Sequence, residues 1–139
     1  MSKQEVIICR SLQEDLERAL DAHAYDKLFI LTDEHTRRLC LPLVGSSERI
    51  RQAVPICIGA GDIHKNLDTL AHVWTALSNQ GATRHSLLIN LGGGMVTDLG
   101  GFAAATFKRG FAYINIPTTL LSMVDAAAVS YTHLRAHET

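Results

Sequence analysis

The glycine-rich stretch NLGGGMVTDLGGF, residues 90–102, has the residue types and spacing that could do chemistry. It holds five of the ten glycines in the chain, and Gly92, Gly93 and Gly94 directly follow an apolar run. Glycines lack a Cβ, so their backbone can approach a ligand closely and can adopt positive φ. If a helix begins after them, its first N–H groups and its dipole favour an anion. The pattern predicts a pyrophosphate-binding turn or, alternatively, only a tight strand-to-helix turn.

Two familiar phosphate-binding patterns do not fit this turn. A dinucleotide fingerprint GxGxxG would need glycine at position 97, where Thr97 stands, and no acidic residue follows about 20 positions later. A P-loop would need the sequence GK[ST] after its glycines, and that sequence is absent. If the turn binds a phosphate, it therefore belongs to another class.

Charged and small residues continue along the helix predicted after the turn. Asp98 is expected in its first turn, where the dipole favours a carboxylate, so it is either a cap or a ligand contact. Lys108 and Arg109 are expected at its end, where cations are favoured, and Arg109 could instead bind a substrate phosphate or carboxylate. Gly100 and Gly101 each cost about 1 kcal/mol inside a helix relative to alanine, which predicts close contact with a strand or a ligand.

Apolar runs rich in β-branched residues alternate with stretches of helical period along the chain. We predict strands at 5–10, 27–33, 54–59, 85–92 and 111–117, and helices at 11–20, 34–44, 64–81 and 95–107. In the third helix Leu67, Leu70, Trp74 and Leu77 share one stripe, and Gly81 is a typical stop. Strands joined by helices at this spacing predict an α/β fold, a Rossmann-like parallel sheet flanked by helices and connected by right-handed crossovers.

Ligands of parallel sheets bind beyond the carboxyl ends of the strands. Small or polar residues follow four of the predicted strands, at 32–35, 59–65, 92–98 and 116–119. We therefore expect these four loops to form one binding edge.

The composition narrows the function classes. The 139 residues are 47% hydrophobic and carry a net charge of -1, which fits one globular domain and disfavours nucleic acid as a partner. No apolar run approaches the roughly 18 residues that would span a membrane, and the N-terminus does not resemble a secretory signal. Cys9, Cys40 and Cys57 are far apart, so we expect small buried hydrophobes in a reducing, cytoplasmic compartment.

Two consecutive motifs carry a specific resemblance. GGGMVTDLGGFAAATFKRG, residues 92–110, and INIPTTLLSMVDAA, residues 114–127, resemble the 3-dehydroquinate synthase family, whose patterns are GGGxxxDxxGFxAxxxxRG and PTTLLxxVDxxxGGK. Iron-dependent alcohol dehydrogenases and glycerol dehydrogenases share the glycine turn and the aspartate but lack the GGF, KRG and IPTTLL elements. The resemblance implies the N-terminal NAD-binding domain of the dehydroquinate synthase-like fold, without the C-terminal helical domain. Alternatives are another sugar phosphate cyclase, a glycerol dehydrogenase-like oxidoreductase, or a non-catalytic NAD-binding module.

The resemblance also implies roles for individual residues. GDIHK, residues 61–65, stands where the family has GExxK, so an aspartate replaces the glutamate. The residues implied to bind NAD are Asp33, Asp62, Lys65, Gly93, Gly94, Met95, Asp98, Thr118 and Thr119, and those implied to face a phosphorylated sugar acid are Arg109 and Asp125.

The family reaction converts 3-deoxy-D-arabino-heptulosonate 7-phosphate into 3-dehydroquinate and phosphate, a step of the shikimate route to aromatic amino acids. It is a carbon–oxygen lyase reaction that combines a redox cycle without net oxidation, phosphate elimination and aldol closure. A divalent metal, zinc or cobalt, assists it, and the ligands of that metal lie in the C-terminal domain. The resemblance therefore implies no metal-binding or catalytic residue in this chain, an inactive fragment, and a homodimeric full-length protein.

The last eleven residues, VSYTHLRAHET, depart from the family pattern, which continues with Val, Gly, Gly and Lys. They are similar to a translated frame of a transposase sequencing adapter. We therefore expect residues 1–128 to be a truncated NAD-binding α/β domain and residues 129–139 to be a non-native tail. We expect the parallel-sheet pattern to end there, with no further helix-to-strand unit.

Overall fold

The computed structural model of the chain describes residues 4–9, 12–45, 47–118 and 131–136. Its strands are β1 (Gln4–Cys9), β2 (Leu28–Asp33), β3 (Val54–Ile58), β4 (Leu87–Gly92), β5 (Ala112–Pro117) and β6 (Tyr131–Ala136). Its helices are α1 (Leu12–Asp21), α2 (Glu34–Leu39), α3 (Leu41–Val44), α4 (Glu48–Gln52), α5 (Leu67–Asn79) and α6 (Gly94–Thr106), with short 3-10 helices η1 (Asp62–His64) and η2 (Phe107–Arg109). All five predicted strands are confirmed, each boundary within two residues.

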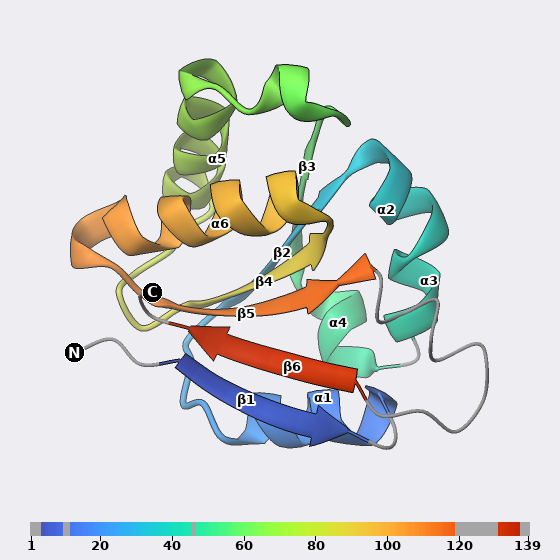
Figure 1. The fold of residues 1–139 in the computed structure, drawn as a ribbon. Coiled ribbons are helices and arrows are strands. Elements are labelled where there is room, and N and C mark those ends of the chain that lie inside the picture. Colours follow the sequence, from blue (N-terminus) through green and yellow to red (C-terminus); the bar gives the residue numbers. More distant parts are fainter. Residues whose placement is uncertain (1–3, 10–11, 46, 119–130, 137–139) are drawn as a thin grey trace.

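The strands form one sheet in the order β1-β6-β5-β4-β2-β3 (Figure 1). β3, β2, β4 and β5 pair in parallel, which confirms the predicted α/β parallel sheet for this block. β6 lies between β5 and β1 and is antiparallel to both, so the complete sheet is mixed.

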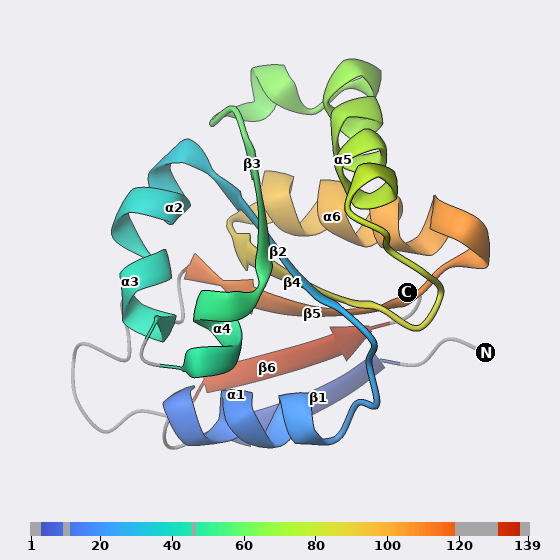
Figure 2. The ribbon, with the colours of Figure 1, turned by 180° about the vertical axis from the view of Figure 1, so that it is seen from behind.

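Helices cover both faces of the parallel block, and each face has its own core. α5 and α6 pack on one face, whereas α1 and α4 pack on the other, as the two opposite views show (Figures 1 and 2). Successive residues of a strand point to opposite faces. Accordingly Leu88 of β4 packs toward α6, whereas Leu87 and Ile89 belong to the core beneath α1. Every residue of β4 is buried, as expected for a central parallel strand.

Local sequence explains how the helices begin and end. Asp33 caps the start of α2. This helix ends at Cys40, because Pro42 can stand only in the first turn of a new helix, which is α3. Gly81 follows α5 with a φ of 80°, which confirms the predicted glycine stop. The predicted stripe of α5 is wrong at Leu67, which is 78% exposed.

One α-helix and one strand were not predicted. α4 has only five residues, too few for a clear periodic signal, and it is capped by the hydroxyl of Ser47. β6 lies in the segment where we predicted no further helix-to-strand unit; it pairs antiparallel with both neighbours and so does not extend the parallel block. It can form because the edge of β5 offers unpaired backbone groups, which an extended segment of almost any sequence can pair.

The described cysteines are less buried than predicted. Cys40 and Cys57 are both free thiols and both half-buried, so the expectation of fully buried hydrophobes is wrong for these two. Burial, with a smaller contribution from the negative charge of Asp33, raises the pKa of the Cys40 thiol. The side chain of Cys9 lies outside the described residues.

No helix within the described ranges is both long and apolar enough to cross a membrane. α5 and α6 have 13 residues each, which corresponds to about 20 Å. The hydrocarbon core of a bilayer is about 30 Å thick.

Candidate functional site at the carboxyl edge of the parallel strands

The carboxyl ends of the four parallel strands lie at one edge of the sheet. Asp33, the last residue of β2, pairs with Ile58 at the end of β3, and Gly92 at the end of β4 pairs with Pro117 at the end of β5. The starts of α2 and α6 are at the same edge (Figure 1). The structure therefore brings together the loops that were predicted to form one binding edge.

The glycine turn connects β4 to α6 without positive φ. Gly93 is the N-cap of α6 with a φ of -77°, and none of Gly92, Gly93 and Gly94 has a left-handed backbone. The predicted use of positive φ is therefore wrong. A Cβ added to Gly92 would lie 2.6 Å from the Cβ of Val96, so packing requires glycine there. A Cβ on Gly93 or Gly94 would meet no atom within 4 Å, so the surface at these two residues is open.

The N-terminus of α6 lies directly at this open surface. Its N-cap residue has no side chain, so no side chain accepts a hydrogen bond at the cap. The hydroxyl of Thr97 donates to the carbonyl oxygens of Gly93 and Gly94, at 3.2 Å and 3.1 Å. It therefore does not accept a hydrogen bond from the first backbone N–H groups of α6. These N–H groups and the positive end of a 13-residue helix can therefore meet an anionic ligand.

An ion pair spans the edge beside the turn. The Nζ of Lys65 lies 3.0 Å from Oδ2 of Asp98, and the two side chains are 51% and 62% exposed. Asp98 lies just beyond the first turn of α6, so the prediction that it stands in that turn is wrong. An exposed pair of this kind contributes about 0–1 kcal/mol to stability, so a ligand can displace either partner at small cost.

Three further predicted residues have defined surroundings. The carboxylate of Asp33 accepts a hydrogen bond from the N–H of Thr36 at 2.8 Å, as part of the capping box of α2. The side chain of Met95 is 8% exposed and belongs to the core, so only its backbone faces the turn. Thr118 is half-buried and directly follows β5.

Arg109 is not brought to the glycine turn within this chain. It is exposed at the far end of α6, about 20 Å along the helix from the turn. Arg109 and Lys108 have φ values of 75° and 45°, so they do not continue the helix as predicted C-terminal cations. The side chain of Asp62, whose backbone forms η1, and the whole of Thr119 and Asp125 lie outside the described residues.

The two glycines inside α6 make the predicted close contact with strands. A Cβ on Gly100 would lie 1.9 Å from Oδ1 of Asn90 on β4, and a Cβ on Gly101 would lie 3.2 Å from the ring of Tyr113 on β5. Asn90 is completely buried and its Nδ2 donates to Oδ1 of Asn115 at 3.0 Å. Sequence reasoning missed this amide pair. An asparagine inside an otherwise apolar strand is the signal that could have revealed it.

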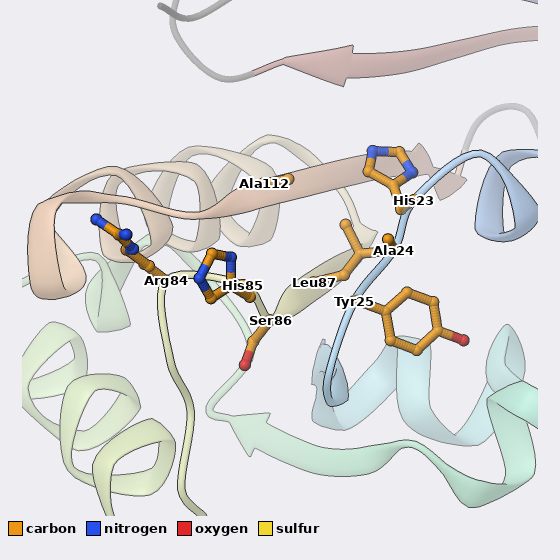
Figure 3. A pocket seen from close by; sticks show the side chains of 8 residues that line it. All are labelled: His23, Ala24, Tyr25, Arg84, His85, Ser86, Leu87 and Ala112. Atoms are coloured by element: carbon orange, nitrogen blue, oxygen red, sulfur yellow. The ribbon is translucent and has the colours of Figure 1, made fainter.

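A pocket at the opposite edge of the sheet does not resemble a binding site. It has a volume of about 160 Å³ and is lined by His23, Ala24, Tyr25, Arg84, His85, Ser86, Leu87 and Ala112. Figure 3 shows the side chains of Arg84 and Tyr25 extending in opposite directions, so the polar groups do not converge. The described side chains also contain no group of three His, Cys, Asp or Glu residues that could hold a metal ion.

Comparison with known proteins identifies the family. A family model described as 3-dehydroquinate synthase N-terminal matches residues 55–137, more than half of the chain. The chain belongs to the 3-dehydroquinate synthase family. A 3-dehydroquinate synthase of Parabacteroides distasonis is 55% identical over 127 residues, which are 91% of this chain and 36% of that protein. The chain therefore spans about a third of the length of this 3-dehydroquinate synthase.

Solved structures of sugar phosphate cyclases share the fold. A 2-deoxy-scyllo-inosose synthase in complex with carbaglucose-6-phosphate, NAD+ and Co2+ is 23% identical, with a TM-score of 0.68 over 91% of this chain and 37% of that one. A 2-epi-5-epi-valiolone synthase from Streptomyces hygroscopicus with NAD+ and Zn2+ bound is 29% identical, with a TM-score of 0.67 over 86% of this chain and 34% of that one. The Rossmann-like architecture of this member of the 3-dehydroquinate synthase family is therefore that of the cyclases.

Proposed function

We propose that this chain is the NAD-binding part of a cytoplasmic 3-dehydroquinate synthase. The full-length enzyme would convert 3-deoxy-D-arabino-heptulosonate 7-phosphate into 3-dehydroquinate and phosphate. Membership of the family and 55% identity to a named 3-dehydroquinate synthase support this reaction over that of another cyclase or a polyol dehydrogenase.

The observation that carries the proposal is the open glycine surface at the start of α6. Gly93 and Gly94 have room for a ligand where a Cβ would otherwise stand, and they lie over the uncapped N-terminus of a long helix. A pyrophosphate fits this arrangement because backbone N–H groups and the helix dipole both favour an anion. The backbone of Met95 belongs to the same first turn and would complete the seat.

The neighbouring residues would hold the remainder of the cofactor. Asp98 and Lys65 would exchange their mutual ion pair for contacts with the dinucleotide, and Thr118 is beside the turn because Pro117 pairs with Gly92. On the adenosine side we propose Asp33 and Asp62, with Thr119 next to Thr118. When bound, NAD would supply reversible hydride transfer.

The substrate and metal contacts complete the proposal. Arg109 and Asp125 would bind the phosphorylated sugar acid, since arginine suits planar oxyanions. The described side chains contain no group of three residues that could hold a metal ion. We propose that residues from another part of the full-length protein bind zinc or cobalt. We also propose that the full-length protein is a homodimer. The chain alone would bind NAD without turnover.

Calorimetric titration of the chain with NAD tests the cofactor site. We expect binding by the unaltered chain and at least about tenfold weaker binding by Gly93→Ala and Gly94→Ala, because their methyl groups would occupy the pyrophosphate seat. Melting temperatures should stay within about 5 °C of the unaltered chain. Neither methyl group meets a neighbour, so only helix propensity and capping change, by about 1 kcal/mol. Gly45→Ala, at the end of α3 and away from the turn, is the control for NAD binding; its Cβ would lie 3.3 Å from the carbonyl oxygen of Leu41. No heat and no thermal shift with NAD would refute the proposal.

The full-length protein tests the reaction. With the heptulosonate phosphate, NAD and a divalent metal, we expect release of inorganic phosphate. Absence of release, or oxidation of glycerol in its place, would contradict the synthase assignment.

We also retain the proposal that residues 129–139 are non-native. Resequencing the locus tests it, and a continuous native reading of that segment would reject it.

A further inference from the structure

A pair of asparagines lies beneath α6, close to the carboxyl edge. Asn90 of β4 and Asn115 of β5 are register partners, and Nδ2 of Asn90 donates to Oδ1 of Asn115 at 3.0 Å. Asn90 is 0% exposed, whereas Asn115 is half-buried. One amide is therefore enclosed in the core, whereas the residue that carries the other is only partly covered.

The contact with Gly100 determines which way the Asn90 amide faces. Its Oδ1 has no hydrogen-bond partner among the described residues. The Cβ position of Gly100 is 1.9 Å from this oxygen, and a Cα–C bond is about 1.5 Å, so Cα lies within about 3.4 Å of it. That distance suits a weak Cα–H···O contact. The reverse orientation would place two amide N–H donors against a C–H group and leave both unpaired, which is costly in a buried site.

The orientation of Asn115 follows from that of Asn90. Because its Oδ1 accepts the hydrogen bond from Asn90, its Nδ2 must point away from Asn90. In the part of the chain that the structure describes, this Nδ2 has no hydrogen-bond partner. Asn115 is two residues before Pro117, which is opposite the first glycine of the turn. Asn115 thus carries a pair of N–H donors two residues before the carboxyl end of β5.

We propose that Asn115 is a ligand-contacting residue of this site and that Asn90 is its positioning residue. The two N–H donors of Asn115 suit an uncharged oxygen acceptor, a carbonyl or hydroxyl, on either NAD or the sugar acid substrate. The inference rests on the proposed function, because it assigns a further contact within that cofactor and substrate site.

Asn115→Asp is the sharpest test. Aspartate has the same shape and still accepts the hydrogen bond from Asn90, but it replaces the outward donor by a carboxylate oxygen. We expect a melting temperature within about 2 °C of the unaltered chain and at least about tenfold weaker ligand binding, because two oxygens would then face each other. Asn79→Asp, exposed at the end of α5, is the matched control and should bind normally.

Two titrations distinguish the source of the oxygen. Weaker binding of NAD alone would place the acceptor on the cofactor. Unchanged NAD binding with weaker binding of the heptulosonate phosphate in the presence of NAD would place it on the substrate. If both ligands bind Asn115→Asp as tightly as the unaltered chain, the inference is wrong while the proposed function stands. If the unaltered chain does not bind NAD, both fail.

A double-mutant cycle tests the positioning role of Asn90. In an otherwise unaltered chain, Asn90→Ala should weaken ligand binding several-fold, because the side chain of Asn115 can then rotate. It should change binding by less than about twofold in an Asn115→Ala background, since no amide remains to be positioned. An equal effect in both backgrounds would show that Asn90 acts only on the fold. If Asn115→Asp does not fold, Asn115→Ser provides the same test, and normal ligand binding by that variant would overturn the inference.

Discussion

Gly100→Ala is the substitution that best tests the packing of α6 on the sheet. In an exposed helix this change would stabilise the protein by about 1 kcal/mol. Here the new Cβ would lie 1.9 Å from Oδ1, 2.4 Å from Cγ and 2.9 Å from Nδ2 of Asn90. Even the shortest tolerated separation, 3.0 Å, requires a movement of about 1.1 Å. Asn90 is completely buried, so this movement must displace α6 or the asparagine itself.

The expected loss of stability can be worked from these contacts. Overpacking a core costs about 1–3 kcal/mol. Loss of the Asn90–Asn115 hydrogen bond adds about 1 kcal/mol, and the gain in helix propensity offsets about 1 kcal/mol. We therefore expect Gly100→Ala to lower the free energy of unfolding by about 1–3 kcal/mol, a fall in melting temperature of roughly 3–15 °C for a chain of this size.

Thermal and urea unfolding, followed by circular dichroism, measure this loss. Gly101→Ala is the control in the same helix, because its Cβ would be 3.2 Å from Tyr113 and needs only a small adjustment. In an Asn90→Ala background the clash is removed, so Gly100→Ala should become neutral or stabilising. A Gly100→Ala chain as stable as the unaltered one, or an equal loss in both backgrounds, would refute the reasoning.

Three further predictions follow from single contacts. Asp98→Asn should weaken NAD binding at least about tenfold in calorimetry while changing stability by less than about 1 kcal/mol, because the ion pair with Lys65 is exposed; a parallel loss of both would contradict a ligand role. Hydrogen bonds from Thr83, the larger cause, and Ser86 lower the pKa of Asp26 below its ordinary value. The bonds therefore stabilise the fold above about pH 4, and this stabilisation is lost as the pH falls through the lowered pKa. Asp26→Asn should remove this acid-dependent part of the unfolding free energy, measured from about pH 5 down to about pH 2. Because burial raises the pKa of Cys40, its alkylation by iodoacetamide at pH 8, followed by mass spectrometry, should be slower than that of free cysteine; an equal rate would contradict the assigned burial.

The glycine turn shows how far sequence reasoning reached. Its position between a buried strand and a helix was predicted, because both elements have strong local patterns. Its backbone conformation was predicted wrongly, because φ depends on how α6 leaves the sheet and not on glycine alone. The predicted position of Asp98 was wrong for the same reason. Helix α6 starts one residue earlier than predicted, so Asp98 lies beyond its first turn.

The sequence by itself determined the parallel block, the edge at which a ligand would bind, and the family, because apolar periodicity and consecutive motifs are properties of local sequence. The tertiary structure alone decided which side chains meet across that edge. Lys65 and Asp98 are 33 residues apart and Asn90 and Asn115 are 25 apart, and both pairs form only when the sheet brings them together. It also decided that Gly93 and Gly94 face open space whereas Gly100 packs against a buried amide. Local sequence cannot distinguish these glycines, because the difference lies in neighbours supplied by other strands.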